Sequence, residues 1–173
     1  MKRYQDGFTL IEITAVLVLM AIISAYVIGR SIGTEQIDLA GQTDKIRVQI
    51  RYSQAMAMKR TAPDEIWGIK FDTGTDQYWL FFASIPVDAG EPDLAAQQVT
   101  FPGEQNKKVS AAAVGIDILP PGFTLFFDRF GRPFDSFVDE NNNNLLNPAK
   151  TITISADSLT RSITVNPETG LVQ

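Results

Sequence analysis

The run FTLIEITAVLVLMAIISAYVIG lies close to the amino terminus, at residues 8–29, and Glu12 is the one charged side chain within it. At about 1.5 Å per residue, a helix of this length spans about 33 Å, which is enough to cross the hydrocarbon core of a bilayer. Its small hydroxyl side chains, Thr9, Thr14 and Ser24, can bond back to helix carbonyls. A carboxylate inside such a helix costs about 2.5–3.5 kcal/mol, so we expect Glu12 to meet a specific cation. The alternative is an ordinary anchor helix that tolerates one acid.

A short charged leader, MKRYQDG at residues 1–7, precedes this run. Lys2 and Arg3 favour the cytoplasmic side of a membrane, while the apolar stretch inserts. A secretory signal peptide has its small-residue cleavage site after the apolar region, whereas here Gly7 stands before it. We therefore predict that the apolar helix is kept in the mature chain.

The residues Gly7-Phe8-Thr9-Leu10-Ile11-Glu12 closely resemble the processing site of type IV prepilins and type II secretion pseudopilins. The resemblance implies that a prepilin peptidase cleaves between Gly7 and Phe8 and that the new amino terminus on Phe8 is methylated. It also implies that this amine meets the Glu12 carboxylate of a neighbouring subunit during assembly. The expected partners are therefore the peptidase, other pilins or pseudopilins, and the bacterial inner membrane.

The chain has 173 residues and contains neither cysteine nor histidine. This composition excludes disulfides, thiol nucleophiles, Ser/His/Asp triads and zinc sites built from Cys or His. We predict that the chain is not an enzyme. The alternative is an anchored enzyme built from acids, and its candidates are Asp128, Asp135, Asp139 and Glu140, although acids in turns are usually solvated.

Charge is distributed unevenly along the chain. Residues 30–60 carry six basic and three acidic side chains, whereas residues 61–173 carry seven basic and fifteen acidic ones, a net charge of −8. An acidic head repels a phosphate backbone, so the pattern disfavours nucleic-acid binding. Lys107 and Lys108 form the one adjacent basic pair in this part of the sequence, and we predict that they lie in a solvated loop.

Residues 37–60 contain no proline and have apolar or small side chains at spacings of four and three. This spacing predicts a helix with one narrow buried face. The positions of this face are Leu39, Thr43, Ile46, Ile50, Ser53 and Ala57. We expect one long helix over residues 8–59, with its outer half packed on a globular head. Its glycines, which each cost about 1 kcal/mol relative to alanine, allow a bend near residues 29–34.

Strand patterns follow the helix. Residues 65–72 and 77–84 flank the turn sequence Thr73-Gly74-Thr75-Asp76, which predicts a hairpin. The run Trp79-Leu80-Phe81-Phe82 does not alternate and indicates burial on both faces. Residues 85–108 contain three prolines and predict an irregular connection suited to recognition. Further short strands are expected at residues 98–101, 114–119, 123–127, 151–155, 161–165 and 171–173.

A long helix followed by an antiparallel β-rich head resembles the minor pilins and pseudopilins of the FimT/GspH-like group. Residues 46–57, 127–133 and 163–170 carry this narrower resemblance. It implies an α+β, pilin-like fold in which a long amino-terminal helix packs on an antiparallel β-sheet. The expected parts are a leader at 1–7, a transmembrane helix at 8–29, an amphipathic extension at 30–60 and a periplasmic head at 61–173.

The segment Asp139-Glu140-Asn141-Asn142-Asn143-Asn144 is rich in oxygen ligands. Asp139, Asn141 and Asn143 have the alternating spacing found at the start of calcium loops. However, Asn144 stands where such loops have glycine, Lys150 stands where they have an acid, and asparagine runs also form exposed turns. We expect no cofactor, with calcium at this loop as the alternative.

The resemblance implies a structural subunit of a type IV pilus or of a type II secretion pseudopilus, which serves filament assembly or initiation. The alternative is a pilus-associated binding module, either an adhesin or a DNA-uptake minor pilin. DNA-binding members of the group have a basic tail, whereas this chain ends Gly170-Leu171-Val172-Gln173. We therefore favour the assembly role.

Overall fold

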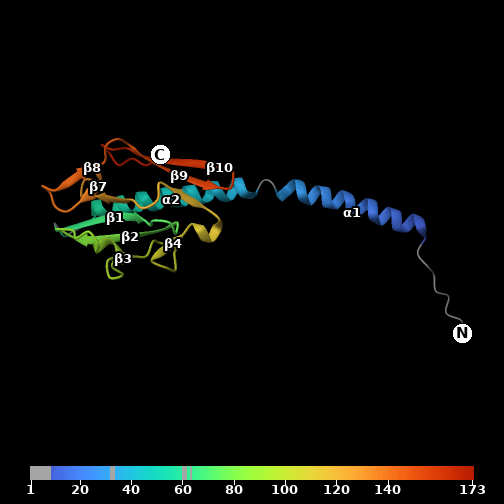
Figure 1. Ribbon diagram of the computed structural model, residues 1–173, viewed down its shortest axis with the longest axis horizontal. Coiled ribbons are helices and arrows are strands. Elements are labelled where there is room, and N and C mark those ends of the chain that lie inside the picture. The colour runs from blue at the N-terminus through green and yellow to red at the C-terminus, as the bar shows by residue number, and fades with distance from the viewer. Residues whose placement is uncertain (1–8, 32–33, 60–61, 63) are drawn as a thin grey trace, which may run out of the picture. The chain divides into compact units, whose positions relative to one another are not determined.

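The computed structural model describes residues 9–31, 34–59, 62 and 64–173 (Figure 1). The chain forms two compact units, Met1–Asp38 and Leu39–Gln173. The first contains α1 (Leu10–Ser31) and the beginning of α2 (Thr34–Lys59), and the second contains the rest of α2 and all the strands. Where the sequence predicts one helix over residues 8–59, the structure describes these two, and residues 8 and 32–33 lie outside the described part.

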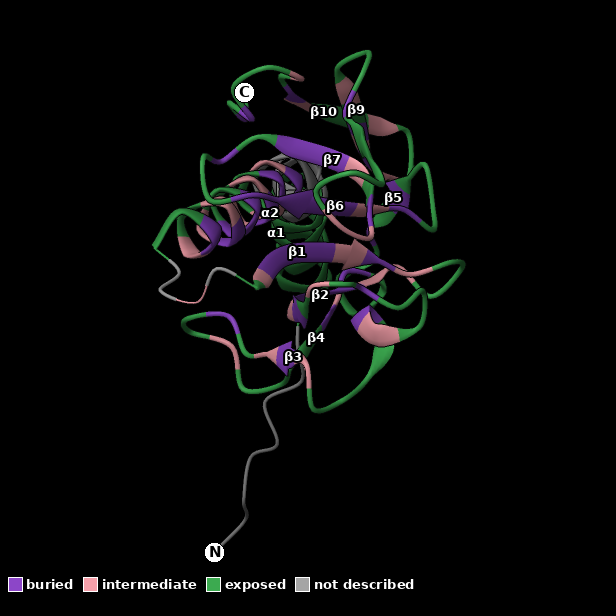
Figure 2. Ribbon diagram, turned by 90° about the vertical axis from the view of Figure 1, so that its left-hand side faces the viewer, coloured by how far each residue is buried: buried purple, intermediate pink, exposed green. Residues whose placement is uncertain are grey.

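One face of α2 is buried in the head, as the spacing predicts (Figure 2). Its polar members satisfy their hydroxyl groups within the helix: Thr43 Oγ1 donates to the Leu39 carbonyl oxygen at 2.7 Å, and Ser53 Oγ donates to that of Ile50 at 2.7 Å. The exposed fraction is at most 2% at all six positions, Leu39, Thr43, Ile46, Ile50, Ser53 and Ala57. The predicted stripe is therefore confirmed in full.

The larger of two antiparallel sheets has the order β3-β2-β1-β6-β7-β8, and β4 also pairs with β2. Its central hairpin is the predicted one, with Phe71 of β1 opposite Tyr78 of β2. In the hairpin turn, Thr75 donates a hydrogen bond to the Asp72 carboxylate, and this bond is the main cause of the lowered pKa of Asp72. The strands are β1 (Glu65–Phe71), β2 (Gln77–Ser84), β3 (Gln98–Val99), β4 (Lys108–Ser110), β6 (Thr124–Phe127), β7 (Pro133–Phe137) and β8 (Asn143–Leu145).

The smaller sheet has the order β10-β9-β5, with β5 at Asp117–Leu119, β9 at Lys150–Ala156 and β10 at Leu159–Val165. Several predicted strands are shorter than expected, and β3 covers only Gln98–Val99 of the strand predicted over residues 98–101. Residues 112–114 form the short 3-10 helix η2 (Ala112–Val114), so the strand expected over 114–119 begins only at Asp117. The carboxyl-terminal strand is reduced to one bridge, between Val165 and Val172.

The core has two parts, one on each face of the larger sheet. The first lies among α2, one face of the larger sheet and the smaller sheet, and it includes Tyr78 and Leu80. The second lies on the opposite face and includes Trp79 and Phe81. Successive side chains of β2 therefore enter different clusters, which confirms the predicted burial on both faces.

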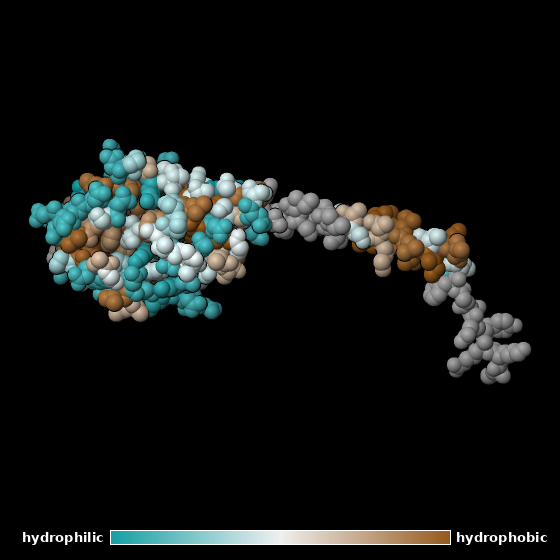
Figure 3. All heavy atoms as spheres, viewed as in Figure 1, coloured by the Kyte–Doolittle hydropathy of each residue, from teal (hydrophilic) through white to brown (hydrophobic). Residues whose placement is uncertain are grey.

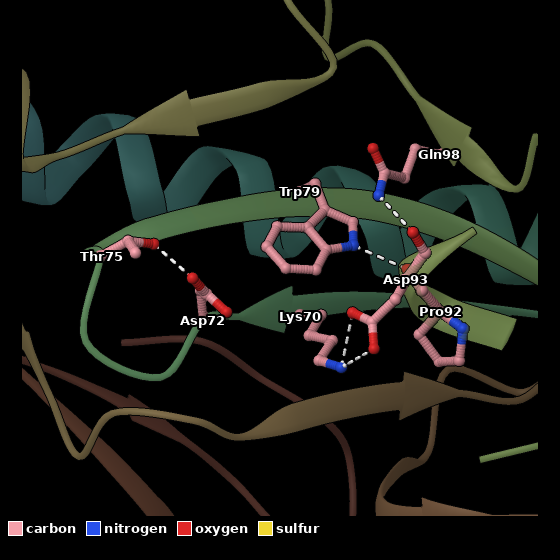
Figure 4. Close-up of polar contacts among 7 residues, drawn as sticks. All are labelled: Lys70, Asp72, Thr75, Trp79, Pro92, Asp93 and Gln98. Carbon is pink, nitrogen blue, oxygen red and sulfur yellow. Dashed lines mark hydrogen bonds and ion pairs between the residues drawn. The ribbon is translucent and has the colours of Figure 1, made fainter. Parts of the chain in front are cut away.

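The connection after β2 is largely irregular and exposed, as predicted, and part of it is packed on the second cluster. Figure 4 shows Trp79 Nε1 donating to the Pro92 carbonyl oxygen at 2.7 Å and Gln98 Nε2 donating to that of Asp93 at 3.1 Å. Lys70 Nζ also lies 2.7 Å from the Asp93 carboxylate. These contacts fix the short 3-10 helix η1 (Glu91–Asp93) against the sheet.

The prediction of a solvated loop at Lys107 and Lys108 is confirmed in part, because both residues are exposed and Lys107 lies in a loop, whereas Lys108 belongs to a strand. Lys107 Nζ donates to the Ala95 carbonyl oxygen at 2.7 Å. Lys108 begins β4, and its Nζ lies 4.2 Å from the centre of the Trp79 ring. Both ammonium groups are therefore engaged with the head itself.

A polar chain joins α2 to β2 through the core. The Tyr78 hydroxyl donates to Gln49 Oε1 at 2.6 Å, and Gln49 Nε2 donates to Glu104 Oε1 at 3.1 Å. Lys45 Nζ lies 2.7 Å from the same Glu104 oxygen. Burial, assisted by the nearby Glu104 charge, raises the pKa of Tyr78.

We expect this tyrosine to limit stability in alkali. Folding favours the neutral phenol, so the contribution of Tyr78 to the free energy of unfolding is complete below the pKa of an unfolded tyrosine, about 10. Above that pH this contribution falls by about 1.4 kcal/mol per pH unit. Tyr78→Phe is expected to lower the free energy of unfolding by about 1 kcal/mol at neutral pH, because one hydrogen bond is lost. Above pH 10, the stability of this variant is expected to decline less steeply than that of the wild-type chain. Urea unfolding of both proteins at several pH values measures this, and parallel pH profiles would contradict it.

Candidate assembly helix and head surface

The described side chains of α1 are mostly apolar, and all of those at residues 10–26 are exposed. Figure 3 shows one face of this apolar helix. Because a helix turns about 100° per residue, the consecutive exposed residues 16–20 alone cover its whole circumference. A helix that is apolar all round is normally covered by other surfaces. Eleven large side chains are at least 50% exposed: Leu10, Ile11, Ile13, Val16, Leu17, Val18, Leu19, Met20, Ile22, Ile23 and Tyr26. Over the residues that the structure describes, no helix combines the length and hydropathy needed to cross a membrane.

Glu12 lies in the first turn of α1 and is exposed. Its backbone N–H faces Thr9, at 3.0 Å from the carbonyl oxygen and 3.3 Å from Oγ1, so Thr9 caps the helix. The sequence analysis missed this cap, although Thr-x-x-Glu before an apolar run is its signature. Within the described part of the chain, the Glu12 carboxylate has no ion-pair partner. Gly7 and Phe8 lie outside the described residues.

The threonine that follows Glu12 by two positions behaves as predicted. Thr14 Oγ1 donates to the Ile11 carbonyl oxygen at 2.9 Å, so its hydroxyl is satisfied within the helix. Glu12 therefore differs from its polar neighbours in α1, because Thr9 and Thr14 both have hydrogen-bond partners in the helix and the Glu12 carboxylate does not.

Gln54 of α2 connects by hydrogen bonds the three segments on which the resemblance to the FimT/GspH-like group rests, residues 46–57, 127–133 and 163–170. Its Nε2 donates to the carbonyl oxygens of Gly131 at 2.9 Å and Thr169 at 3.0 Å. Gly170 fits between them with φ +65°, and a Cβ at this position would lie 2.5 Å from the Gly131 oxygen. One turn earlier on α2, Arg51 donates to the Val172 carbonyl oxygen at 2.6 Å. These contacts fasten the carboxyl terminus to the helix.

Asp128 is buried, unlike the solvated turn acid that the sequence analysis expected. Its Oδ1 accepts the backbone N–H groups of Phe130 and Arg132, each at 2.9 Å. Its Oδ2 lies 2.7 Å from both Nε and Nη2 of Arg132. All acceptor positions of this carboxylate are thus in use, and its role is to shape the turn between β6 and β7.

The asparagine-rich segment is a closed turn. Asp139 Oδ1 accepts the backbone N–H groups of Asn141 and Asn142, each at 2.8 Å. Asn143 Nδ2 donates to the carbonyl oxygens of Asp139 at 3.0 Å and Glu140 at 2.8 Å. The side chains of Asp139 and Asn143 therefore bond within the turn. Over the described residues, no group of three acidic side chains that could hold a metal ion is found.

The comparison with known families places this geometry in context. Residues 2–28 match the family model described as the prokaryotic N-terminal methylation motif. No curated protein and no solved structure matches the chain. The motif implies processing by a prepilin peptidase and assembly with other pilins. The match covers Gly7, Phe8 and Glu12 together with most of α1. The chain therefore carries the prokaryotic N-terminal methylation motif, which is consistent with a type IV pilin-like protein.

Proposed function

We propose that the chain is a structural, non-enzymatic subunit of a type IV pilus or a type II secretion pseudopilus, acting in filament assembly or initiation. The observation that carries the proposal is α1, most of which lies within the matched motif, and which has exposed apolar side chains around its circumference and one carboxylate. Such a helix suits storage in a bilayer and later burial among similar helices. The proposed location is the bacterial inner membrane, crossed once, with the head in the periplasm.

Glu12 is proposed to be the assembly residue. After cleavage between Gly7 and Phe8, the methylated Phe8 amine of one subunit would face the Glu12 carboxylate of its neighbour. Both charges would then be paired inside an apolar core, where either one alone is costly. The unpaired carboxylate on the exposed helix supports this arrangement.

Mass spectrometry of the chain purified from its natural host tests the proposal. The expected mature protein begins at Phe8, lacks the seven leader residues and carries one methyl group on its amine. A matched Gly7→Val variant, which puts a branched side chain at the cleavage site, is expected to keep the leader. An intact leader in the wild-type protein, or loss of the whole apolar run, would refute it.

We propose that the head does not bind nucleic acid, so that the DNA-uptake alternative fails. Its net charge of −8 repels phosphates, and Lys107 and Lys108 are occupied by the Ala95 carbonyl group and the Trp79 ring. Gel-shift assays at low salt are expected to show no retarded DNA up to micromolar protein. A shift that weakens as salt is added would favour the alternative.

We also propose that the subunit needs no cofactor. A calcium ion at residues 139–144 would share the Asp139 carboxylate with the two backbone N–H groups that its Oδ1 already accepts. Calorimetric titration with calcium is expected to give no binding heat at millimolar ion, with Asp139→Asn as the matched control. Saturable heat that this variant abolishes would establish the calcium alternative.

A further inference from the structure

A cavity of about 350 Å³ opens on the head beside the loop between β6 and β7. The buried rings of Phe134 and Phe137 contribute an apolar lining, and Ile85 and the exposed Leu145 extend it. Phe130 also lines the cavity although 64% of its surface is exposed. The cavity therefore has a mixed lining, in which an apolar part lies beside charged side chains, and the exposed ring of Phe130 is part of it.

The side chains around Phe130 are those that dominate protein interfaces. The guanidinium carbons of Arg129 and Arg132 lie 4.8 Å and 5.5 Å from the centre of its ring. Met58, at the end of α2, is 57% exposed and lies beside Gly131, where a Cβ would be 3.0 Å from its sulfur. Aromatic residues, arginine and methionine are enriched at interface centres, whereas single exposed apolar residues need no explanation.

The hydrogen-bonding capacity of this surface favours an occupant that brings acceptors. Asp128 is saturated by Arg132 and two backbone N–H groups. Arg132 keeps Nη1 free, and Arg129 makes no ion pair with any described residue. Among the residues that line the cavity, Glu140 carries the one carboxylate that has no partner among the described residues. Arginine forks match carboxylates in geometry and charge.

We propose that this cavity docks a segment of a partner protein that carries an apolar side chain beside a carboxylate. The apolar side chain enters the space over Phe134 and Phe137, and the carboxylate meets Arg129. Glu140 opposes the same carboxylate and so moderates the affinity. The proposal does not depend on α1 or Glu12, and it holds or fails whichever filament the chain joins.

The test uses the full chain in detergent micelles and two capped dipeptides, acetyl-Asp-Phe-amide and acetyl-Asn-Phe-amide, in calorimetric or ligand-detected NMR titrations. The acidic peptide is expected to bind roughly tenfold more tightly than its amide analogue. Arg129→Gln should abolish this difference, and Glu140→Gln should tighten binding of the acidic peptide several-fold. Arg161→Gln, which removes an exposed arginine from β10, is the matched control and should change nothing.

Three outcomes would overturn the proposal. In the first, the acidic peptide and its amide analogue bind the wild-type chain with equal affinity, and Arg129→Gln changes neither affinity. In the second, neither peptide binds at millimolar concentration. Alternatively, acetyl-Lys-Phe-amide could bind more tightly than the acidic peptide and lose affinity in Glu140→Gln, which would assign a basic partner. The three substituted side chains are exposed, so each variant is expected to keep the wild-type melting temperature, and thermal melts check this.

Discussion

Replacing Glu12 with alanine is expected to leave the chain inserted and cleaved but to lower its incorporation into filaments by more than about 100-fold. The loss follows from stranding the charged amine of a neighbouring subunit inside an apolar core, which costs about 3–5 kcal/mol. The start of α1 should survive, because Thr9 accepts its hydrogen bonds from the backbone of Glu12 and not from the side chain. Immunoblots of sheared filaments and of membranes, compared at equal expression, measure the effect.

Two further variants separate charge from shape. Glu12→Gln keeps the size of the side chain but removes its charge, so it should behave like the alanine variant. Thr14→Ala removes a hydroxyl whose one hydrogen bond stays within the helix, at the Ile11 carbonyl oxygen, and should assemble normally. Normal incorporation of Glu12→Gln would mean that pairing with an amine is not what Glu12 does.

The parts of the fold that repeat at a regular spacing were predictable from the sequence. The buried face of α2 and the hairpin of β1 and β2 both appear where the spacing places them. A buried helix face produces apolar residues at spacings of four and three, and a strand that is buried on both faces produces a continuous apolar run. Both patterns can be recognised in the sequence. The amino-terminal motif could also be recognised from the sequence, because its residues are contiguous.

The parts that depend on long-range contacts were not predictable. β7 begins at a proline and β8 is a short, exposed strand in an asparagine run, so neither has the pattern of a strand. They are strands because β7 pairs with β6 and β8 pairs with β7. Asp128 looks like a solvated turn acid until Arg132 folds back on it. The cavity beside Phe130 combines residues from three separate stretches, Ile85, the 128–137 region and the 140–145 region.

Gly68→Ala is expected to destabilise the head by about 1–3 kcal/mol or more. Gly68 lies in the middle of β1, opposite Phe81 of β2 and Phe126 of β6. A Cβ there would lie 2.5 Å from the Phe81 ring and 2.6 Å from the Leu125 carbonyl oxygen. Because Phe81 is fully buried and Leu125 is held in the paired strand, neither neighbour can move aside without disturbing the sheet.

Gly41→Ala is the matched control for this substitution. Gly41 is exposed in α2, and a Cβ there would have no atom within 4 Å, so the change should stabilise the chain by about 0.5–1 kcal/mol. Urea unfolding followed by the fluorescence of Trp67 and Trp79, which both lie in the head, measures both variants. Adding Phe81→Leu to Gly68→Ala should recover only part of the loss, because the contact with the Leu125 oxygen remains. Equal stabilities for Gly68→Ala and Gly41→Ala would show that the central strand is not packed as described, since close approach of the backbone at Gly68 is what excludes a side chain there.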